Sequence, residues 1–221
     1  PENDLALACP SPHFIPPASA RQMADDLSAL PVWWAMRGDA VCVASVKEAR
    51  RWAEEAGGIC PEVRWVGRDG LPSDADVDSW GWSPLMVQRL LTGGADRSRL
   101  PDEARLARYR ELSNRRHAVD MLAYLCGSGS DLGQKWRDRL CGVSYYCTGE
   151  QDIIQRMRQY PETLLKAPWS GSGKGLRLGR GGYVPPLSGW CGRQLREQGG
   201  VIVEPVYNKL SDFALEFYAD G

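Results

Sequence analysis

A lysine followed by a glycine-rich loop is the part of this sequence whose residue types best suit a chemical role. Lys166 ends a short apolar run, and the segment 170–175 that follows reads Ser-Gly-Ser-Gly-Lys-Gly. Glycine has no Cβ, so it lets backbone N–H groups approach an anion closely and accepts positive φ angles. The two lysines and two serines add positive charge and hydroxyl donors. These residue types predict a loop that covers the phosphates of a nucleotide.

The loop does not match the common phosphate-binding fingerprints. A P-loop requires Gly-x-x-x-x-Gly-Lys-Ser/Thr, whereas Gly173-Lys174 is followed by Gly175. A dinucleotide-binding or kinase loop requires Gly-x-Gly-x-x-Gly, but Leu176 stands three residues after Gly173. Considered alone, the loop could equally be a mobile, solvated segment.

A second segment, close to the end of the chain, carries acidic residues at strand positions. Two strands are predicted, at 201–204 and 212–218, on either side of a turn-prone Tyr-Asn-Lys-Leu-Ser. In the second strand three large apolar residues alternate with Asp212 and other small or acidic residues, which is the period of a half-buried strand. The first strand ends in Val203-Glu204.

In this order the residues resemble the ATP-grasp superfamily. The matching features are a strand lysine, a loop of small residues, a helix, a strand that ends in Val-Glu, and an acidic residue that starts the next strand. The resemblance covers about residues 113–221, roughly half of the chain. It implies that a nucleotide lies between two α+β subdomains.

The resemblance also implies a role for each matching residue. Lys166 would reach the α- and β-phosphates, and the loop 170–175 would be a flexible lid over the β- and γ-phosphates. Glu204 to Tyr207 would form the hinge that binds the adenine edge, and Asp212, where many members have Glu or His, would bind the ribose hydroxyls. Arg115, at a helix start similar to one in the family, is a further candidate near the phosphates. The complete set of candidate residues is Lys166, Ser170, Gly171, Ser172, Gly173, Lys174, Gly175, Glu204, Pro205, Val206, Tyr207, Asp212 and Arg115.

Each of these residues also has an ordinary structural interpretation. A lysine at a strand end is usually solvated, and Glu204 could simply pair with a surface cation. Lys174 and Arg177 could only keep a mobile loop soluble. The order of the features favours function for Lys166 and Glu204, and we expect these two side chains to line opposite walls of one cleft.

Composition limits the other classes of function. A net charge of −1 and the lack of a basic cluster argue against nucleic acid as a partner. No apolar run approaches the roughly 20 residues of a membrane span, and no signal peptide is visible, so we expect a soluble, cytoplasmic protein. Seven scattered cysteines without a Cys-x-x-Cys spacing, and two histidines, disfavour a disulfide framework and a zinc site. Buried free thiols in a reducing cytoplasm are the better interpretation.

The pattern of elements predicts an α/β fold that becomes α+β in its second half. Strands at 32–35, 40–43 and 63–66 alternate with helices at 18–30, 45–57 and 84–92, which favours an open, mostly parallel sheet over residues 1–112. Residues 113–221 would form the ATP-grasp-like nucleotide-binding region, incomplete at its C-terminal end. Their predicted helices cover 117–125, 148–160 and 187–198. The polar cluster Glu2-Asn3-Asp4 could face a substrate or cap a helix, and capping is favoured.

The function implied by the resemblance is an ATP-dependent ligase. It would activate an unknown small-molecule carboxylate as an acylphosphate for attack by an amine or thiol. The chain lacks an initiator methionine and stops just after an expected strand, so we expect truncation at both ends, with Mg²⁺ ligands beyond Gly221. A small-molecule kinase, a nucleotide-binding module without chemistry, and an α/β domain with an ordinary glycine loop remain alternatives. The sequence indicates no particular substrate and no oligomeric state.

Overall fold

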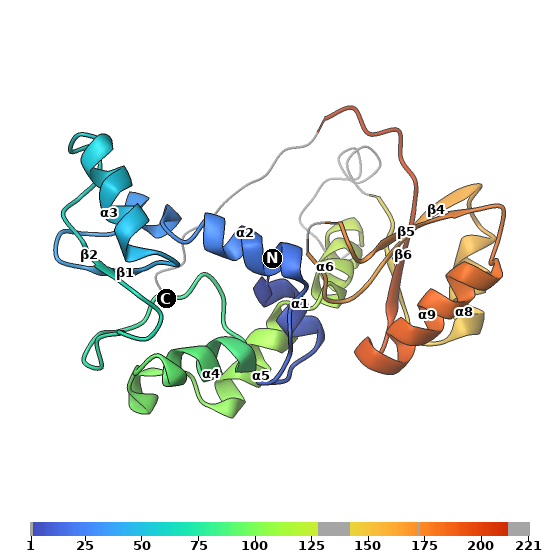
Figure 1. The fold of residues 1–221 in the computed structure, drawn as a ribbon. Coiled ribbons are helices and arrows are strands. Elements are labelled where there is room, and N and C mark those ends of the chain that lie inside the picture. The colour runs from blue at the N-terminus through green and yellow to red at the C-terminus, as the bar shows by residue number, and fades with distance from the viewer. Residues whose placement is uncertain (1, 128–141, 172, 212–221) are drawn as a thin grey trace. The chain divides into compact units, whose positions relative to one another are not determined.

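A computed structural model of the chain describes residues 2–127, 142–171 and 173–211 (Figure 1). The chain divides into two compact units. The first comprises Pro1–Ala118 together with Ala167–Gly175, and the second comprises Val119–Lys166 together with Leu176–Gly221. The content is mixed α/β, with one parallel and one antiparallel sheet among the described residues. No helix in the described part has the length and apolar character needed to cross a membrane.

The first unit is mainly helical. Its helices are α1 Glu2–Ala8, α2 Ala18–Asp26, α3 Val46–Glu55, α4 Pro84–Thr92 and α5 Glu103–Leu112, with two 3-10 helices, η1 Leu30–Trp33 and η2 Arg97–Arg99. A further helix, α6 Arg116–Cys126, begins in this unit. Its strands, β1 Ala40–Cys42 and β2 Arg64–Val66, pair in parallel with Val41 opposite Trp65. The parallel pairing is as predicted, but within the described residues this sheet has two strands.

Side-chain caps explain why these helices begin where the sequence predicts. The Ser45 hydroxyl accepts the N–H of Glu48 at the start of α3, and the Ser83 hydroxyl accepts the N–H of Met86 at the start of α4. Such bonds satisfy N–H groups that have no partner within a helix. The predicted strand at 32–35 is wrong, because Leu30–Trp33 form the 3-10 helix η1, and the fixed φ of Pro31 suits its first turn.

Two small hydrophobic clusters hold the first unit together. One contains Val41, Val43 and Ala49, so it joins β1 to α3, with Trp65 of β2 packed against it. The other contains Val87, Ala95, Leu100 and Leu106 of α4, α5 and the segment between them, and Trp82 packs against this cluster. The Trp80-Gly81-Trp82 segment therefore contributes Trp82 to packing.

The second unit is built on an antiparallel sheet of strand order β3-β6-β4-β5. The strands are β3 Tyr145–Cys147, β4 Glu162–Lys166, β5 Leu176–Arg180 and β6 Val201–Pro205, and the helices are α8 Glu150–Met157 and α9 Pro185–Gln198. Strands β4 and β6 and both helices agree with the sequence predictions. Strand β3 lies where the sequence Ser144-Tyr145-Tyr146-Cys147 favours a strand, and β5 is an additional strand. The predicted strand at 212–218 lies outside the described residues.

The helices of this unit cover one face of the sheet. Helices α8 and α9 contact each other, and both contact β6. Along β4, Thr163 and Leu165 are buried while Lys166 is half-buried, so alternate side chains point to the two faces. The register pairs Leu164 with Glu204, which places Lys166 and Glu204 together on the face opposite Leu165.

Candidate functional site

Lys166 and Glu204 form an ion pair on neighbouring strands of the second unit. The Lys166 Nζ lies 2.5 Å from the Glu204 Oε2, and the two side chains are 26% and 22% exposed. In the register of β4 and β6, Lys166 is opposite Ile202, so Glu204 is its diagonal neighbour on the same face. The expectation that the two residues line opposite walls of a cleft is therefore wrong: they lie side by side on one sheet.

Ser144 completes this group, and the sequence analysis did not single it out. Its hydroxyl donates to Glu204 Oε1 at 3.0 Å, so both carboxylate oxygens have a partner. Ser144 directly precedes β3, whose Tyr146 is opposite Ile202 of β6. The antiparallel register carries Ser144 to the position facing Glu204. Only a prediction of strand order could have found this serine, because it lies 60 residues from Glu204 in the sequence.

The proposed hinge, Glu204 to Tyr207, begins with the last two residues of β6 and continues beyond the strand. Val206 donates its N–H to the carbonyl of Glu162 at 3.1 Å, and Pro205 has no N–H to offer. The Tyr207 hydroxyl accepts the N–H of Val143 at 2.9 Å. The backbone donor of Val206 is thus already used, and adenine recognition by this hinge stays a prediction.

The glycine loop belongs to the first unit, where Arg115 binds its base. Arg115 donates from one guanidinium nitrogen to the Ala167 carbonyl at 2.7 Å and to the Ser170 hydroxyl at 2.8 Å. Its other terminal nitrogen donates to the Ser170 carbonyl at 2.7 Å. The loop closes on itself, since Ala167 N–H donates to the Gly175 carbonyl at 2.8 Å. In this structure the Arg115 side chain holds the loop, and its contact with a phosphate stays a prediction.

The structure explains why three positions of the loop are occupied by glycine. Gly173 has a φ of +73°, a conformation that other residues rarely adopt. A Cβ at Gly171 would overlap the carboxylate of Asp4, and a Cβ at Gly175 would overlap the side chain of Ser170. The N–H of Lys174 donates to the Gly171 carbonyl at 3.1 Å. Because a carboxylate lies against the loop, phosphate binding there would place two anionic groups close together.

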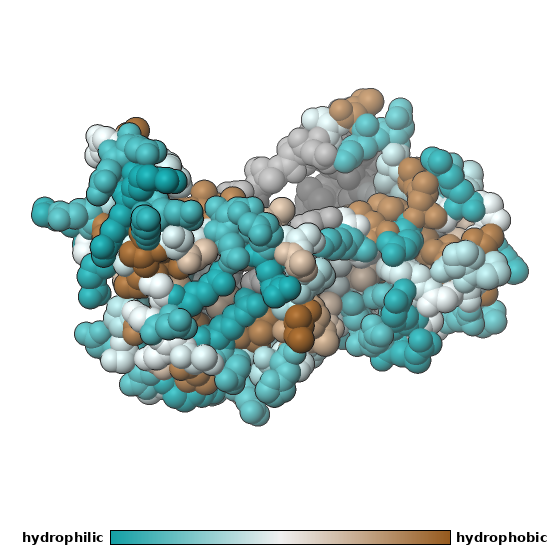
Figure 2. All heavy atoms as spheres, in the orientation of Figure 1, coloured by the Kyte–Doolittle hydropathy of each residue, from teal (hydrophilic) through white to brown (hydrophobic). Residues whose placement is uncertain are grey.

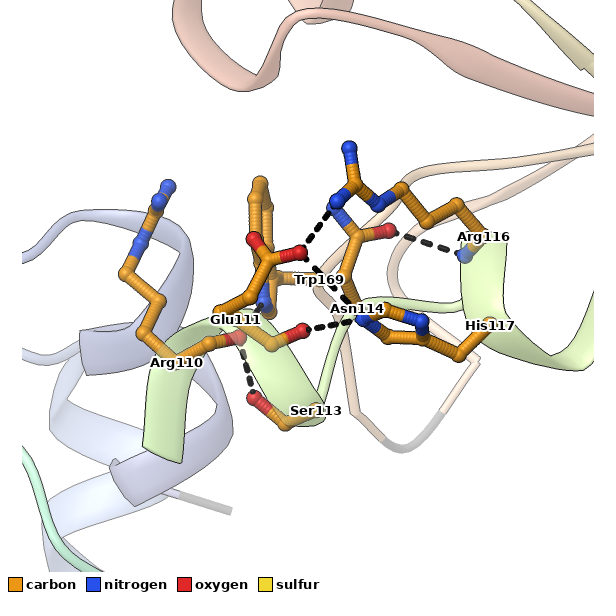
Figure 3. A network of polar contacts seen from close by, with 7 residues as sticks. All are labelled: Arg110, Glu111, Ser113, Asn114, Arg116, His117 and Trp169. Carbon is orange, nitrogen blue, oxygen red and sulfur yellow. Dashed lines mark hydrogen bonds and ion pairs between the residues drawn. The ribbon is translucent and has the colours of Figure 1, made fainter. Parts of the chain in front are cut away.

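Trp169 anchors the start of this loop to helix α5 (Figure 3). Its indole N–H donates to the Arg110 carbonyl at 2.8 Å, and the Arg110 guanidinium lies 3.7 Å from the centre of the indole ring. Arg110 Nε also donates to the Leu7 carbonyl at 2.8 Å. Burial lowers the pKa of Arg110 from its ordinary value, although Glu111 acts in the opposite direction. Arg110 thus joins α1, α5 and the loop.

The turn between α5 and α6 carries its own polar network, also drawn in Figure 3. Glu111 forms an ion pair with Arg116 and lies 3.3 Å from His117 Nε2. The Asn114 side chain accepts the N–H of Arg116 at 2.9 Å, at the start of α6. This network fixes the backbone next to Arg115, so it positions the residue that holds the loop.

Two candidate residues, Ser172 and Asp212, lie outside the described residues. The remaining candidates form two groups. Lys166, Glu204, Pro205, Val206 and Tyr207 belong to the second unit, and Arg115, Ser170, Gly171, Gly173, Lys174 and Gly175 belong to the first. Within the described ranges, no three His, Cys, Asp or Glu side chains gather as a metal site. Mg²⁺ binding, for which the sequence leads us to expect ligands beyond Gly221, stays a prediction.

No protein-family model matches the chain, and no curated protein matches it. Among solved structures, the chain is similar to a RimK domain protein ATP-grasp from Sphaerobacter thermophilus, at 18% sequence identity and a TM-score of 0.33. The match covers 71% of this chain and 57% of that one, so the chain spans less than two thirds of that protein's length.

Proposed function

We propose that this protein binds ATP in the manner of ATP-grasp proteins, with Lys166 and Glu204 as nucleotide contacts. The observation that carries the proposal is the ion pair between them, which joins a strand lysine to a strand glutamate across 38 residues of sequence. Between them lie a glycine loop, a strand and a helix, realised as 170–175, β5 and α9. Apart from the additional strand β5, this is the order of elements on which the resemblance rests.

The ion pair provides a specific way to bind a polyphosphate. Lys166 is only partly exposed, and its ammonium group is paired with the Glu204 carboxylate. The register of β4 and β6 places the two side chains next to each other. An incoming phosphate would compete with the Glu204 carboxylate for the ammonium group, exchanging one anionic partner for another. The carboxylate so released could accept a hydrogen bond from the adenine amino group. Binding would then depend on both residues.

The proposed reaction is carboxylate activation. A carboxylate oxygen attacks the γ-phosphorus, the bond to the β-phosphate oxygen breaks, and ADP leaves with that electron pair. An amine or thiol then attacks the carbonyl carbon of the acylphosphate, releasing inorganic phosphate. Lys166 would contribute by neutralising negative charge on the α- and β-phosphates, next to the γ-phosphoryl group that is transferred. Which carboxylate reacts is a question for a substrate screen.

Calorimetric titration with Mg-ATP tests nucleotide binding. The parent protein should bind, and Lys166→Ala should weaken binding by at least about tenfold, as expected for loss of a charged phosphate contact. Lys47→Ala is the matched control, because Lys47 is an exposed lysine on α3 and should leave affinity unchanged. An absence of binding by the parent, or equal losses in both variants, contradicts the proposal.

Trapping with hydroxylamine tests the chemistry. An acylphosphate reacts with hydroxylamine to give a hydroxamate, so ADP release accompanied by hydroxamate supports the ligase reaction. ADP release with a phosphorylated alcohol and no hydroxamate would indicate the kinase alternative. Binding of ATP without any ADP, across a panel of carboxylates, would indicate a binding module.

A further inference from the structure

The first unit contains a cavity that the nucleotide proposal does not use. Its volume is about 550 Å³, within the range of about 300–1,000 Å³ that is typical of small-molecule sites. It lies between α2 and η1 on one side and the end of β1 and the start of α3 on the other. Ser28 and Ala44 join these sides, since the Ala44 N–H donates to the Ser28 hydroxyl at 3.1 Å. All of the residues that line the cavity belong to this one unit.

Two tryptophans form the aromatic part of its lining. The ring centres of Trp33 and Trp52 are 6.0 Å apart with an interplanar angle of 80°, and Trp52 packs in the same edge-to-face manner on Trp65 at 6.5 Å. Trp33 nevertheless remains 54% exposed and Trp52 36% exposed. Figure 2 shows hydrophobic residues reaching the surface among hydrophilic ones in this part of the first unit. Exposed indole faces are the best aromatic partners for a cation.

The charged residues of the lining are all acidic. Asp25, Asp26 and Glu48 line the cavity, and none of the lining residues is Lys or Arg. Asp25 forms an ion pair with Arg68, and Asp26 accepts a hydrogen bond from Gln22 at 2.8 Å. Among the described residues, Glu48 has no cationic partner within ion-pair distance.

Helix α3 begins at this cavity, and its N-terminal dipole favours an anion. Glu48 lies in the first turn of the helix and so already complements this partial positive charge. Asp26 adds a second negative charge to the lining, and its Gln22 partner is neutral. The local balance of charge is therefore negative, which disfavours a phosphate or carboxylate ligand and favours a cation.

We propose that this cavity binds an organic ammonium ion. The indole faces of Trp33 and Trp52 would contact the alkyl groups around the nitrogen, and Glu48 and Asp26 would balance its charge. Aromatic rings and carboxylates together select a cation over a neutral molecule of the same shape, because both interactions depend on charge. The inference is independent of the nucleotide proposal, since it uses none of the same residues.

Choline chloride and its uncharged isostere 3,3-dimethyl-1-butanol form the direct test. Calorimetry and tryptophan fluorescence of the full chain should show saturable binding of choline at least about tenfold tighter than the alcohol. Added sodium chloride should weaken choline binding, since the carboxylates are partly screened. Equal affinities for the two compounds would mean that the cavity recognises shape alone and would overturn the proposal. Binding of neither compound would overturn it as well.

Two variants, each with a matched control, test whether choline binds in this cavity. Trp33→Leu and Glu48→Gln should each weaken choline binding by about fivefold or more. Trp80→Leu and Glu54→Gln change another exposed tryptophan and another exposed glutamate that do not line the cavity, so affinity should not change. Circular dichroism establishes that each variant folds. If the controls lose as much affinity as the cavity variants, the proposal is wrong.

Discussion

The carboxylate of Asp4 in α1 lies against the backbone of Gly171, so closely that a Cβ at residue 171 would overlap it. The helix start and the glycine loop are thus packed together within the first unit. Asp4 was predicted to face a substrate or cap a helix, and in the structure it is a packing partner of the loop.

This contact predicts that Gly171→Ala destabilises the protein. Overpacking of this kind costs about 1–3 kcal/mol in the free energy of unfolding, measured by chemical denaturation. The change Asp4→Ala removes the overlapping atoms, so the double variant should recover part of the loss. Gly189→Ala is the control, because nothing surrounds that position in α9 and alanine favours a helix. If Gly171→Ala and Gly189→Ala behave alike, the loop does not pack as described.

The pair Lys166–Glu204 predicts energetic coupling between the two residues. A double-mutant cycle of Lys166→Met and Glu204→Gln should give a coupling of about 1 kcal/mol, because partial exposure limits what an ion pair contributes. A cycle of Lys47→Met with Glu204→Gln should give none. Coupling that is absent from the first cycle would remove the structural basis of the nucleotide proposal.

The elements that the sequence predicts well are those with local signals. Helix α4 occupies the predicted residues 84–92, because Ser83 caps it and Pro84 suits its first turn. Strand β5 gives a weaker signal, because Leu176 and Leu178 alternate with Arg177 and Gly179 over only 5 residues, directly after a glycine-rich loop. The reverse error occurred at Val32–Ala35, where a bulky apolar run indicated a strand but Pro31 favours a 3-10 helix.

The arrangement of the candidate site depended on contacts that are distant in sequence. Arg115 and Ser170 are 55 residues apart, and no periodicity relates them. The family resemblance placed Arg115 near a phosphate, but it could not indicate that the guanidinium holds the loop. Likewise, the ion pair of Lys166 and Glu204 depends on β6 lying beside β4, which is a matter of strand order.

The hydrogen bonds of Arg115 predict that its replacement by lysine loosens the glycine loop. Arg115→Lys keeps the charge but cannot bond both carbonyls and the hydroxyl, because an ammonium lacks the planar fork of a guanidinium. We expect faster tryptic cleavage after Lys174 and a loss of about 1–3 kcal/mol of stability. Arg108→Lys, at an exposed position on α5, should leave both unchanged. Mass spectrometry of the digest locates the cleavage, and equal rates in the two variants would contradict the role given to Arg115.

Cys147 and Cys191 are free thiols that are fully buried in the second unit. Thiol alkylation of the folded protein should modify the exposed Cys9 and leave these two unmodified until the protein unfolds. Peptide mapping after timed exposure to iodoacetamide measures the order. Modification of Cys147 at the rate of Cys9 under native conditions would show that the core of this unit is not packed as described.

The same thiols predict a loss of stability at alkaline pH. Burial raises the pKa of Cys147 to about 12 and that of Cys191 to about 11, against 9.0 for an ordinary thiol. Between pH 9 and 11 the unfolded chain therefore releases protons that the folded chain keeps, so the free energy of unfolding falls as the pH rises, by up to about 1.4 kcal/mol per pH unit for each thiol. Denaturation at several pH values should show this slope, and Cys147→Ala with Cys191→Ala should reduce it. A slope that is the same in the double variant would mean that other groups, and not these buried thiols, govern alkaline unfolding.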